Sequence, residues 1–203
     1  MKIIVLAGGL STERDVSLSS AAGICRTLLE KGHDAYLLDV FMGLENPPEN
    51  LEDVFTLPGH GLEIAKNIGT EEPDLEAVKA SRPDQSNCSL GPNVIELCRM
   101  ADITFLGLHG GEGENGKLQA TFDLLGIRYT GPDSLGCAVA MDKGFTKTGI
   151  PAVRSLYSRR SMPAQERGGP FAERSRSFSS GSCKTLLRRL QHRRVYRQYR
   201  RRI

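Results

Sequence analysis

The sequence predicts an α/β fold built on a parallel β-sheet, and two apolar runs at its start carry this prediction. Residues 3–7 (IIVLA) are continuously apolar and end in Gly8-Gly9, which is typical of a parallel strand buried on both faces. Residues 35–40 (AYLLDV) form a second run of this kind. The residues between them have the period of a helix, so the chain opens with a β-α-β unit whose crossover we expect to be right-handed.

The later elements follow from the same patterns, taken in order along the chain. The stripe of residues 16–31 predicts a helix that ends at Gly32. Residues 45–93 are polar, contain Pro-Pro, Pro-Gly and Gly-Pro pairs, and lack a sustained period, which predicts a long surface excursion with one helix near 74–81. We then expect a helix at 94–100, a strand at 103–108, a helix at 118–125, a short strand at 129–131 and a helix at 135–147.

Charge divides the 203 residues into two parts. Residues 151–203 hold 15 basic and 2 acidic side chains, a net charge of +13, whereas residues 1–150 hold 12 basic and 22 acidic side chains, a net charge of −10. We therefore expect a domain over residues 1–151, with the long insert at 45–93, and an Arg/Ser-rich tail over 152–203. The tail has no sustained apolar stripe, which indicates disorder or a solvated helix.

Cysteine usage and hydropathy predict a cytoplasmic protein. The five cysteines are widely spaced and include no CxxC pair, which favours reduced thiols over a disulfide framework or a zinc site. The apolar start is interrupted by Gly8-Gly9 and is too short for a signal peptide. No run approaches the roughly 20 apolar residues that span a bilayer, so we expect no membrane partner.

Two glycine-rich turns follow predicted strands, at Gly8-Gly9 and at residues 110–116. In an open parallel sheet both would lie at the carboxyl edge, where ligands bind. Backbone N–H groups at such junctions bind anions, but neither GxGxxG nor GxxxxGK[ST] is present, and a plain tight turn explains Gly8-Gly9 equally well.

Glu13 and His109 are the candidate site residues at this edge, and each has a structural alternative. A carboxylate after a glycine turn repels phosphate and suits an amine, yet Glu13 could simply occupy the favourable first turn of a helix. A histidine at a strand end is usually a packed, hydrogen-bonded residue. Here it opens a loop with Glu112 and Glu114 in the same predicted crevice as Glu13, which favours a site.

Four stretches resemble one family in the expected order. Residues 109–119 (HGGEGENGKLQ) resemble the HGxxGE[DN]GxLQ signature of D-alanine:D-alanine ligases, and residues 8–18 (GGLSTERDVSL) resemble their opening GGxSxEREVSL, with Asp15 in place of Glu. Residues 129–131 (YTG) and 141–143 (MDK) also match. The resemblance implies a Rossmann-like, pre-ATP-grasp domain and an ATP-dependent enzyme that activates one D-alanine as an acyl phosphate for attack by the amine of another.

The resemblance also implies roles for individual residues. Glu13 would hold the ammonium of the first D-alanine and, with His109, serve catalysis. Val16, His109 and Gly110 would line the same substrate subsite. Lys143 would contact a nucleotide phosphate, although the sequence alone favours a solvated helix lysine at this position. ATP and Mg²⁺ or Mn²⁺ are the implied cofactors, a homodimer is the implied assembly, and peptidoglycan precursor synthesis is the implied process.

The resemblance covers residues 1 to about 151. The tail has only Glu166 and Glu173 as acids, too few to hold metal ions against phosphates, so we expect no metal ligands there. We expect residues from about 153 onward to be a frameshifted or aberrant end, and the chain to have no appreciable ligase activity. Whether the second substrate is D-alanine, D-serine or D-lactate is not predicted.

An alternative function belongs to another class of protein. An acidic α/β binding module with an Arg-rich tail would contact RNA or other polyanions through its arginines, with Tyr196 and Tyr199 available for stacking. Nonspecific binding of polyanions is the simpler expectation for such a cluster, and a steep salt dependence without sequence preference would be its sign.

Overall fold

The computed structural model describes residues 1–66, 72–144 and 146. They fall into two compact units, Met1–Gly131 and a second that begins at Pro132, and each is described by itself. The predicted end of the first domain at residue 151 and the predicted tail at 152–203 lie outside the described residues.

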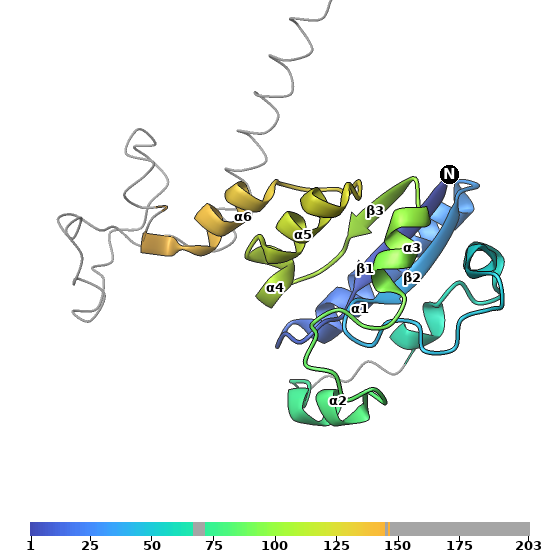
Figure 1. The fold of residues 1–203 in the computed structure, drawn as a ribbon, viewed down its shortest axis with the longest axis horizontal. Helices are drawn as coiled ribbons and strands as arrows, with labels where there is room; N and C mark the ends of the chain where they lie inside the picture. The colour runs from blue at the N-terminus through green and yellow to red at the C-terminus, as the bar shows by residue number, and fades with distance from the viewer. Residues whose placement is uncertain (67–71, 145, 147–203) are drawn as a thin grey trace, which may run out of the picture. The chain divides into compact units, whose positions relative to one another are not determined.

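A sheet of three parallel strands organises the first unit, as predicted. The strands are β1 (Lys2–Ala7), β2 (Asp34–Asp39) and β3 (Ile103–Leu106), and their order in space is β2-β1-β3 (Figure 1). Val5 of β1 pairs with Leu37 on one side and Phe105 on the other. β1 is therefore the central strand, buried on both faces, which is why its sequence is continuously apolar.

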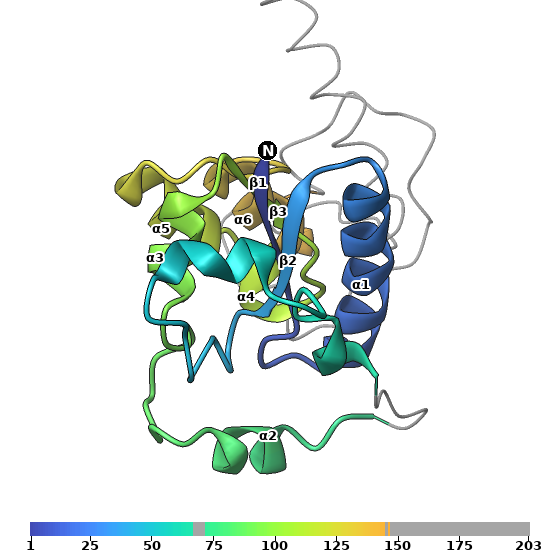
Figure 2. The same cartoon turned by 90° about the vertical axis from the view of Figure 1, so that its right-hand side faces the viewer.

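The alternating side chains of β1 enter two different cores. Ile3, Val5 and Ala7 pack under α1 (Arg14–Glu30), while Ile4 and Leu6 face the opposite side. That side is covered by α3 (Val94–Met100), α5 (Lys117–Leu125) and the 3-10 helix η1 (Leu51–Thr56). Figure 2 shows the resulting layers, with α1 and α3 on opposite faces of the sheet. Helix α1 ends where predicted, with Gly32 in the left-handed region.

The excursion at 45–93 differs from the prediction of a purely polar surface segment. Its helix α2 (Leu75–Ser81) confirms the one that was expected, but Val54 and Phe55 of η1 are buried in the core. After η1 the chain closes the outer edge of the sheet, because the Leu37 amide of β2 donates to the His60 carbonyl at 2.9 Å. η2 (Leu62–Ala65) follows. η1 buries only two neighbouring residues, Val54 and Phe55, so it leaves no period in the sequence.

Three smaller predictions are also corrected. Residues 129–131 form one parallel bridge, between Tyr129 and Thr104, rather than a strand. The short helix α4 (Gly111–Glu114) was not expected, since glycine disfavours helices. In the second unit, α6 spans Ser134–Met141 and is interrupted at Asp142, whose backbone is extended; Lys143, Gly144 and Thr146 are helical again, and residue 147 lies outside the described residues.

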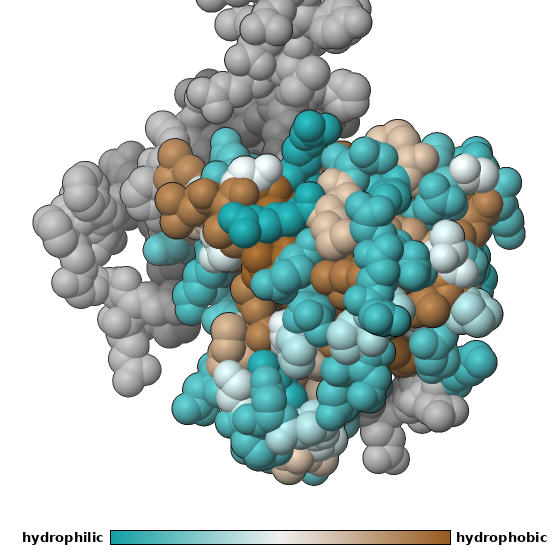
Figure 3. Space-filling view, turned by 45° about the vertical axis from the view of Figure 1, so that its right-hand side comes forward, coloured by the Kyte–Doolittle hydropathy of each residue, from teal (hydrophilic) through white to brown (hydrophobic). Residues whose placement is uncertain are grey.

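The face drawn in Figure 3 is largely hydrophilic with smaller hydrophobic areas between. Within the described ranges, no helix combines the length and the hydropathy needed to cross a bilayer.

Candidate functional site

The carboxyl ends of the three strands meet at one edge of the sheet, and two loops leave it. The first loop, residues 8–13, joins β1 to α1; the second loop, residues 107–116, joins β3 to α5 and contains α4. β1 is flanked by β2 and β3, so the chain departs from β1 in both directions. This is the switch point at which open α/β sheets bind their ligands.

The first loop turns sharply through Gly8, which has a φ of +71°. A Cβ atom there would lie 2.4 Å from a carboxylate oxygen of Asp39, so a side chain is excluded by space as well as by conformation. The Gly8 amide donates to the Ser17 hydroxyl at 2.9 Å, and that hydroxyl donates to the Gly107 carbonyl at 2.8 Å. Ser17 therefore connects the two loops through one buried oxygen.

A buried ion pair supports the first loop. Arg14 contacts the Asp39 carboxylate, with side chains 11% and 3% exposed, and also donates to the Gly9 carbonyl at 2.9 Å. Oδ1 of Asp39 accepts from the amides of Gly9 (3.3 Å), Phe41 (2.8 Å) and Met42 (3.1 Å). Both charges are thus hydrogen-bonded, which a buried pair requires to be stable. The pair fixes the chain on either side of the turn that ends at Glu13.

Glu13 lies at the N-cap of α1, yet its side chain makes no capping hydrogen bond. The backbone amide of Glu13 donates to the Ser11 hydroxyl at 3.0 Å. The alternative interpretation, in which Glu13 serves only to cap its own helix, is therefore not supported by a hydrogen bond. Its negative charge is still favourable at a helix N-terminus. The exposed carboxylate is available to a ligand.

The second loop reaches the first through Gly110. Its φ is +67°, and a Cβ atom there would lie 2.6 Å from the Ser11 hydroxyl. Further along the loop, the buried Gln119 side chain donates to the Gly113 carbonyl at 2.8 Å. These contacts place α4, and with it Glu114, against the end of β3.

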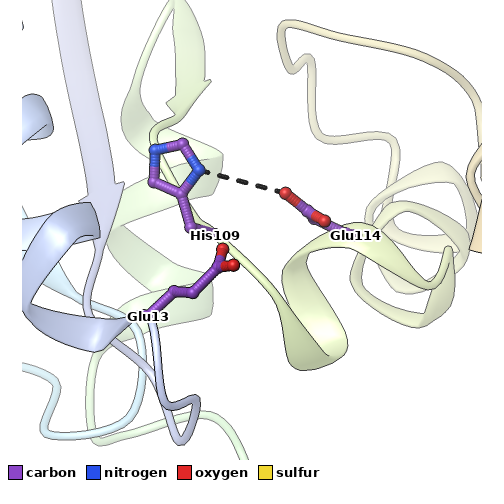
Figure 4. Close-up of side chains that lie close together, drawn as sticks. All are labelled: Glu13, His109 and Glu114. Atoms are coloured by element: carbon purple, nitrogen blue, oxygen red, sulfur yellow. Dashed lines mark ion pairs between the residues drawn. The ribbon is translucent and has the colours of Figure 1, made fainter. Parts of the chain in front are cut away.

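Glu13, His109 and Glu114 converge where the loops meet. One ligand atom of each side chain lies within 4.8 Å of those of the other two. Figure 4 shows Glu13 at the start of α1, His109 just beyond β3 and Glu114 on α4, with the three side chains close together and a dashed line from His109 to Glu114. His109 Nδ1 lies 3.9 Å from Glu114 Oε1, and its Nε2 lies 3.4 Å from the Ser20 hydroxyl. Two carboxylates beside one imidazole suit a cation.

The structure brings together three of the five residues expected at the site. Glu13, His109 and Gly110 lie together, while Val16 is 59% exposed in the first turn of α1. Lys143 belongs to the second unit and is exposed, so it is described apart from them.

Two contributors, Ser17 and Asp39, were missed, and Glu114 was placed in the predicted crevice without being assigned to the site. Asp39 could have been found, since it ends the β2 run at the same edge of the sheet. The sequence placed Glu114 in the second loop, but nothing in the pattern distinguished it from Glu112.

The cluster does not fit the Mg²⁺ that the family implies. Mg²⁺ takes oxygen ligands in octahedral geometry, whereas one of the three donors here is an imidazole nitrogen. Among the described residues this is the one group of three or more His, Cys or acidic side chains spaced for a metal ion.

Known proteins similar to this chain are ligases. The family described as D-ala D-ala ligase N-terminus matches residues 2–132. The D-alanine–D-alanine ligase of Lacticaseibacillus casei is 46% identical over 149 residues, covering 72% of this chain and 41% of that protein. The enzyme of Pediococcus pentosaceus is 47% identical over 150 residues, covering 72% and 42%. A solved D-alanine–D-alanine ligase from Coxiella burnetii is 25% identical, with a TM-score of 0.46 over 79% of this chain and 44% of that one.

The chain thus spans about two fifths of the length of these curated relatives (41% and 42%). The family match covers both loops, from Gly8 through Gly116, and ends one residue beyond the first compact unit. On this match the chain belongs to the family of D-alanine–D-alanine ligase N-terminal domains.

Proposed function

We propose that the first unit of this chain binds the ammonium group of D-alanine for an ATP-dependent D-alanine:D-alanine ligase. The observation that carries the proposal is the convergence of Glu13 and Glu114 on His109 at the switch point of the sheet. A primary ammonium has three donors and one positive charge. The carboxylates of Glu13 and Glu114 complement both, whereas an anionic group would be repelled.

The arrangement also gives the first substrate its chemical role. An amine that donates charge-assisted hydrogen bonds to Glu13 is held in its protonated form. It therefore has no lone pair with which to attack, and the bound D-alanine can take part only through its carboxylate. The second D-alanine must supply the nucleophile. His109 and Gly110 line this subsite, and Val16 would border it from α1.

The remaining parts of the proposal rest on family membership. ATP would supply the phosphoryl group that activates the carboxylate, and the exposed ammonium of Lys143 suits a nucleotide phosphate. The product would serve peptidoglycan precursor synthesis in the cytoplasm, an assignment supported by four free cysteines among the described residues. Homodimerisation, and nonspecific polyanion binding by the tail, are further expectations of the same kind.

Titration calorimetry of the 203-residue chain with D-alanine tests the proposal. We expect binding that is lost with Glu13→Gln, since this change removes the charge and keeps the size of the side chain. A charge-assisted hydrogen bond contributes about 1.5–3 kcal/mol, so affinity should fall about 10- to 100-fold. D-lactate, which has a hydroxyl in place of the ammonium, should bind as weakly to the unaltered chain.

Glu112→Gln is the matched control, because Glu112 lies on α4 beside the cluster but outside it. It should bind D-alanine as the unaltered chain does. Equal affinities for D-alanine and D-lactate would show that the carboxylates do not recognise an ammonium, and the proposal would be wrong.

A further inference from the structure

We propose that Glu13, His109 and Glu114 form a binding site for a divalent transition-metal ion of the Zn²⁺ class, and that this ion excludes D-alanine. The metal site rests on the geometry of the three side chains. Only the exclusion rests on the proposed function. The ion would be an inhibitor of the subsite, separate from the Mg²⁺ that the family implies.

The spacing of the three donors is close to that of a metal site. Zn²⁺ binds imidazole and carboxylate ligands at about 2.0–2.2 Å in a tetrahedron, which places ligand atoms about 3.3 Å apart. His109 Nδ1 and Glu114 Oε1 are 3.9 Å apart, and all three ligand atoms lie within 4.8 Å of one another. Rotations of two glutamate side chains close this difference. Three protein ligands would leave a fourth position for water.

Ser20 orients the imidazole as the second shell of a metal site does. The Ser20 hydroxyl has one proton, which it donates to the Ser17 carbonyl at 3.1 Å. With its proton used in this way, the hydroxyl can accept from His109 Nε2, 3.4 Å away, in the tautomer that carries the hydrogen on Nε2. Histidine ligands of metals commonly donate their other ring N–H to such an acceptor.

This tautomer turns the Nδ1 lone pair toward a carboxylate. In the neutral imidazole Nδ1 has no hydrogen, and the Glu114 oxygen it faces at 3.9 Å is also an acceptor. Two acceptors that face each other repel unless a proton or a metal ion lies between them. With Nε2 directed to Ser20, the Nδ1 atom faces a place that suits a cation, and the carboxylate of Glu13 borders the same place.

The donor set also selects which cation can remain there. One nitrogen and two carboxylate oxygens favour Zn²⁺, Co²⁺ and Ni²⁺, whereas Mg²⁺ and Ca²⁺ prefer oxygen alone. The guanidinium of Arg14, next to Glu13 in the chain, is directed to Asp39 and does not neutralise the cluster. Because the metal and the ammonium use the same carboxylates, one excludes the other.

Co²⁺ titration of the tag-free 203-residue chain in excess Mg²⁺ tests the metal site. We expect one equivalent to bind with visible d–d bands and without the near-ultraviolet charge-transfer band of a thiolate ligand, which separates this site from the free cysteines. Glu114→Gln and His109→Gln should each lower the Co²⁺ affinity more than about 10-fold, and Ser20→Ala about 10-fold. Glu112→Gln, the matched control on α4, should leave it unchanged.

The same titration with D-alanine separates the two proposals. We expect D-alanine to raise the apparent Kd for Co²⁺ in proportion to its concentration, and Zn²⁺ to displace D-alanine in calorimetry. Co²⁺ binding that is lost with Glu114→Gln but insensitive to D-alanine would retain the metal site and overturn the proposed substrate. D-alanine binding with no Co²⁺ uptake, or with uptake that none of the variants reduces, would overturn the metal site alone.

Discussion

The first loop is supported by an ion pair inside the protein, whereas the pair between Lys117 and Glu112 at the second loop lies in solvent. Arg14 and Asp39 are 11% and 3% exposed, while Lys117 and Glu112, which lie 3.5 Å apart beside α4, are 72% and 47% exposed. The conformation of the second loop comes instead from backbone: the positive φ of Gly110 and the carbonyl of Gly113, which accepts from Gln119.

The difference shows that the carboxylates of Glu13 and Glu114 are held beside His109 in two different ways. Glu13 is positioned by charge, since the neighbouring Arg14 is bound to Asp39 and cannot turn toward the site. Glu114 is positioned by chain geometry, because glycines let α4 fold back against β3. The first support should therefore fail when a charge is removed, and the second when a side chain is added.

Asp39→Asn should have the largest effect, because it leaves Arg14 buried without a counter-charge. Breaking a buried pair from one side costs about 3–5 kcal/mol. We expect the free energy of unfolding to fall by that amount in urea denaturation followed by far-ultraviolet circular dichroism. Asp34→Asn, at the exposed start of the same strand, should change it by less than about 0.5 kcal/mol. Equal effects of the two changes would show that the pair does not support the first loop.

Alkaline pH should have the next largest effect, through a thiol on each side of the sheet. Burial raises the pKa of Cys25 on α1 to about 11 and that of Cys98 on α3 to about 12, from an ordinary value of 9.0. Above pH 9 the unfolded chain loses these protons and the folded chain keeps them. The stability they contribute is therefore complete below pH 9 and declines as pH rises toward 11, by up to about 1.4 kcal/mol per pH unit for each thiol.

Cysteine variants test whether the thiols on the two faces of the sheet cause the loss of stability at alkaline pH. Denaturation between pH 8 and pH 10 should show a shallower pH dependence in Cys25→Ala, on the helix that follows the first loop, and likewise in Cys98→Ala, on the helix that precedes β3. Cys88 is exposed, so Cys88→Ala should keep the full slope. An unchanged slope in both buried variants would mean that other groups cause the alkaline loss.

Gly110→Ala should have a smaller effect that is specific to the second loop. A non-glycine residue at this backbone conformation costs about 1–3 kcal/mol, and the new methyl group would collide with Ser11. We expect a loss of stability in that range together with weaker binding of D-alanine. Gly23→Ala in α1 meets nothing within 4 Å and should stabilise by about 0.4–1 kcal/mol. Stabilisation by Gly110→Ala would show that the second loop does not need its glycine.

The same difference explains how much of the site was predictable. Glycine turns after apolar runs revealed both loops, and parallel strands require that their carboxyl ends share an edge, so Glu13, His109 and Gly110 could be placed together from sequence. Asp39 could not be assigned its partner, because Arg14 lies 25 residues away and nothing local couples them.

Outside the site, prediction failed where packing overrides local pattern. The central strand and α1 were readable because repeated apolar residues cover a whole face. The burial of Val54 and Phe55 was not, because a short 3-10 helix with two adjacent buried residues leaves no repeating apolar pattern. The short helix α4 was not predicted because glycines disfavour a helix. The same glycines let α4 approach Leu108 closely, since a Cβ atom at Gly113 would collide with the Leu108 side chain.

The smallest effect should come from the solvent-exposed ion pair of the second loop. Exposed pairs contribute about 0–1 kcal/mol, and often nothing measurable, because water screens the charges and the side chains lose rotational freedom. Lys117 is also the first residue of α5, where the helix dipole disfavours a cation, so Lys117→Gln should leave stability unchanged or raise it slightly. A double-mutant cycle with Glu112→Gln should give a coupling energy below about 0.5 kcal/mol. A coupling energy comparable to the loss from Asp39→Asn would mean that charge, and not glycine geometry, also positions Glu114.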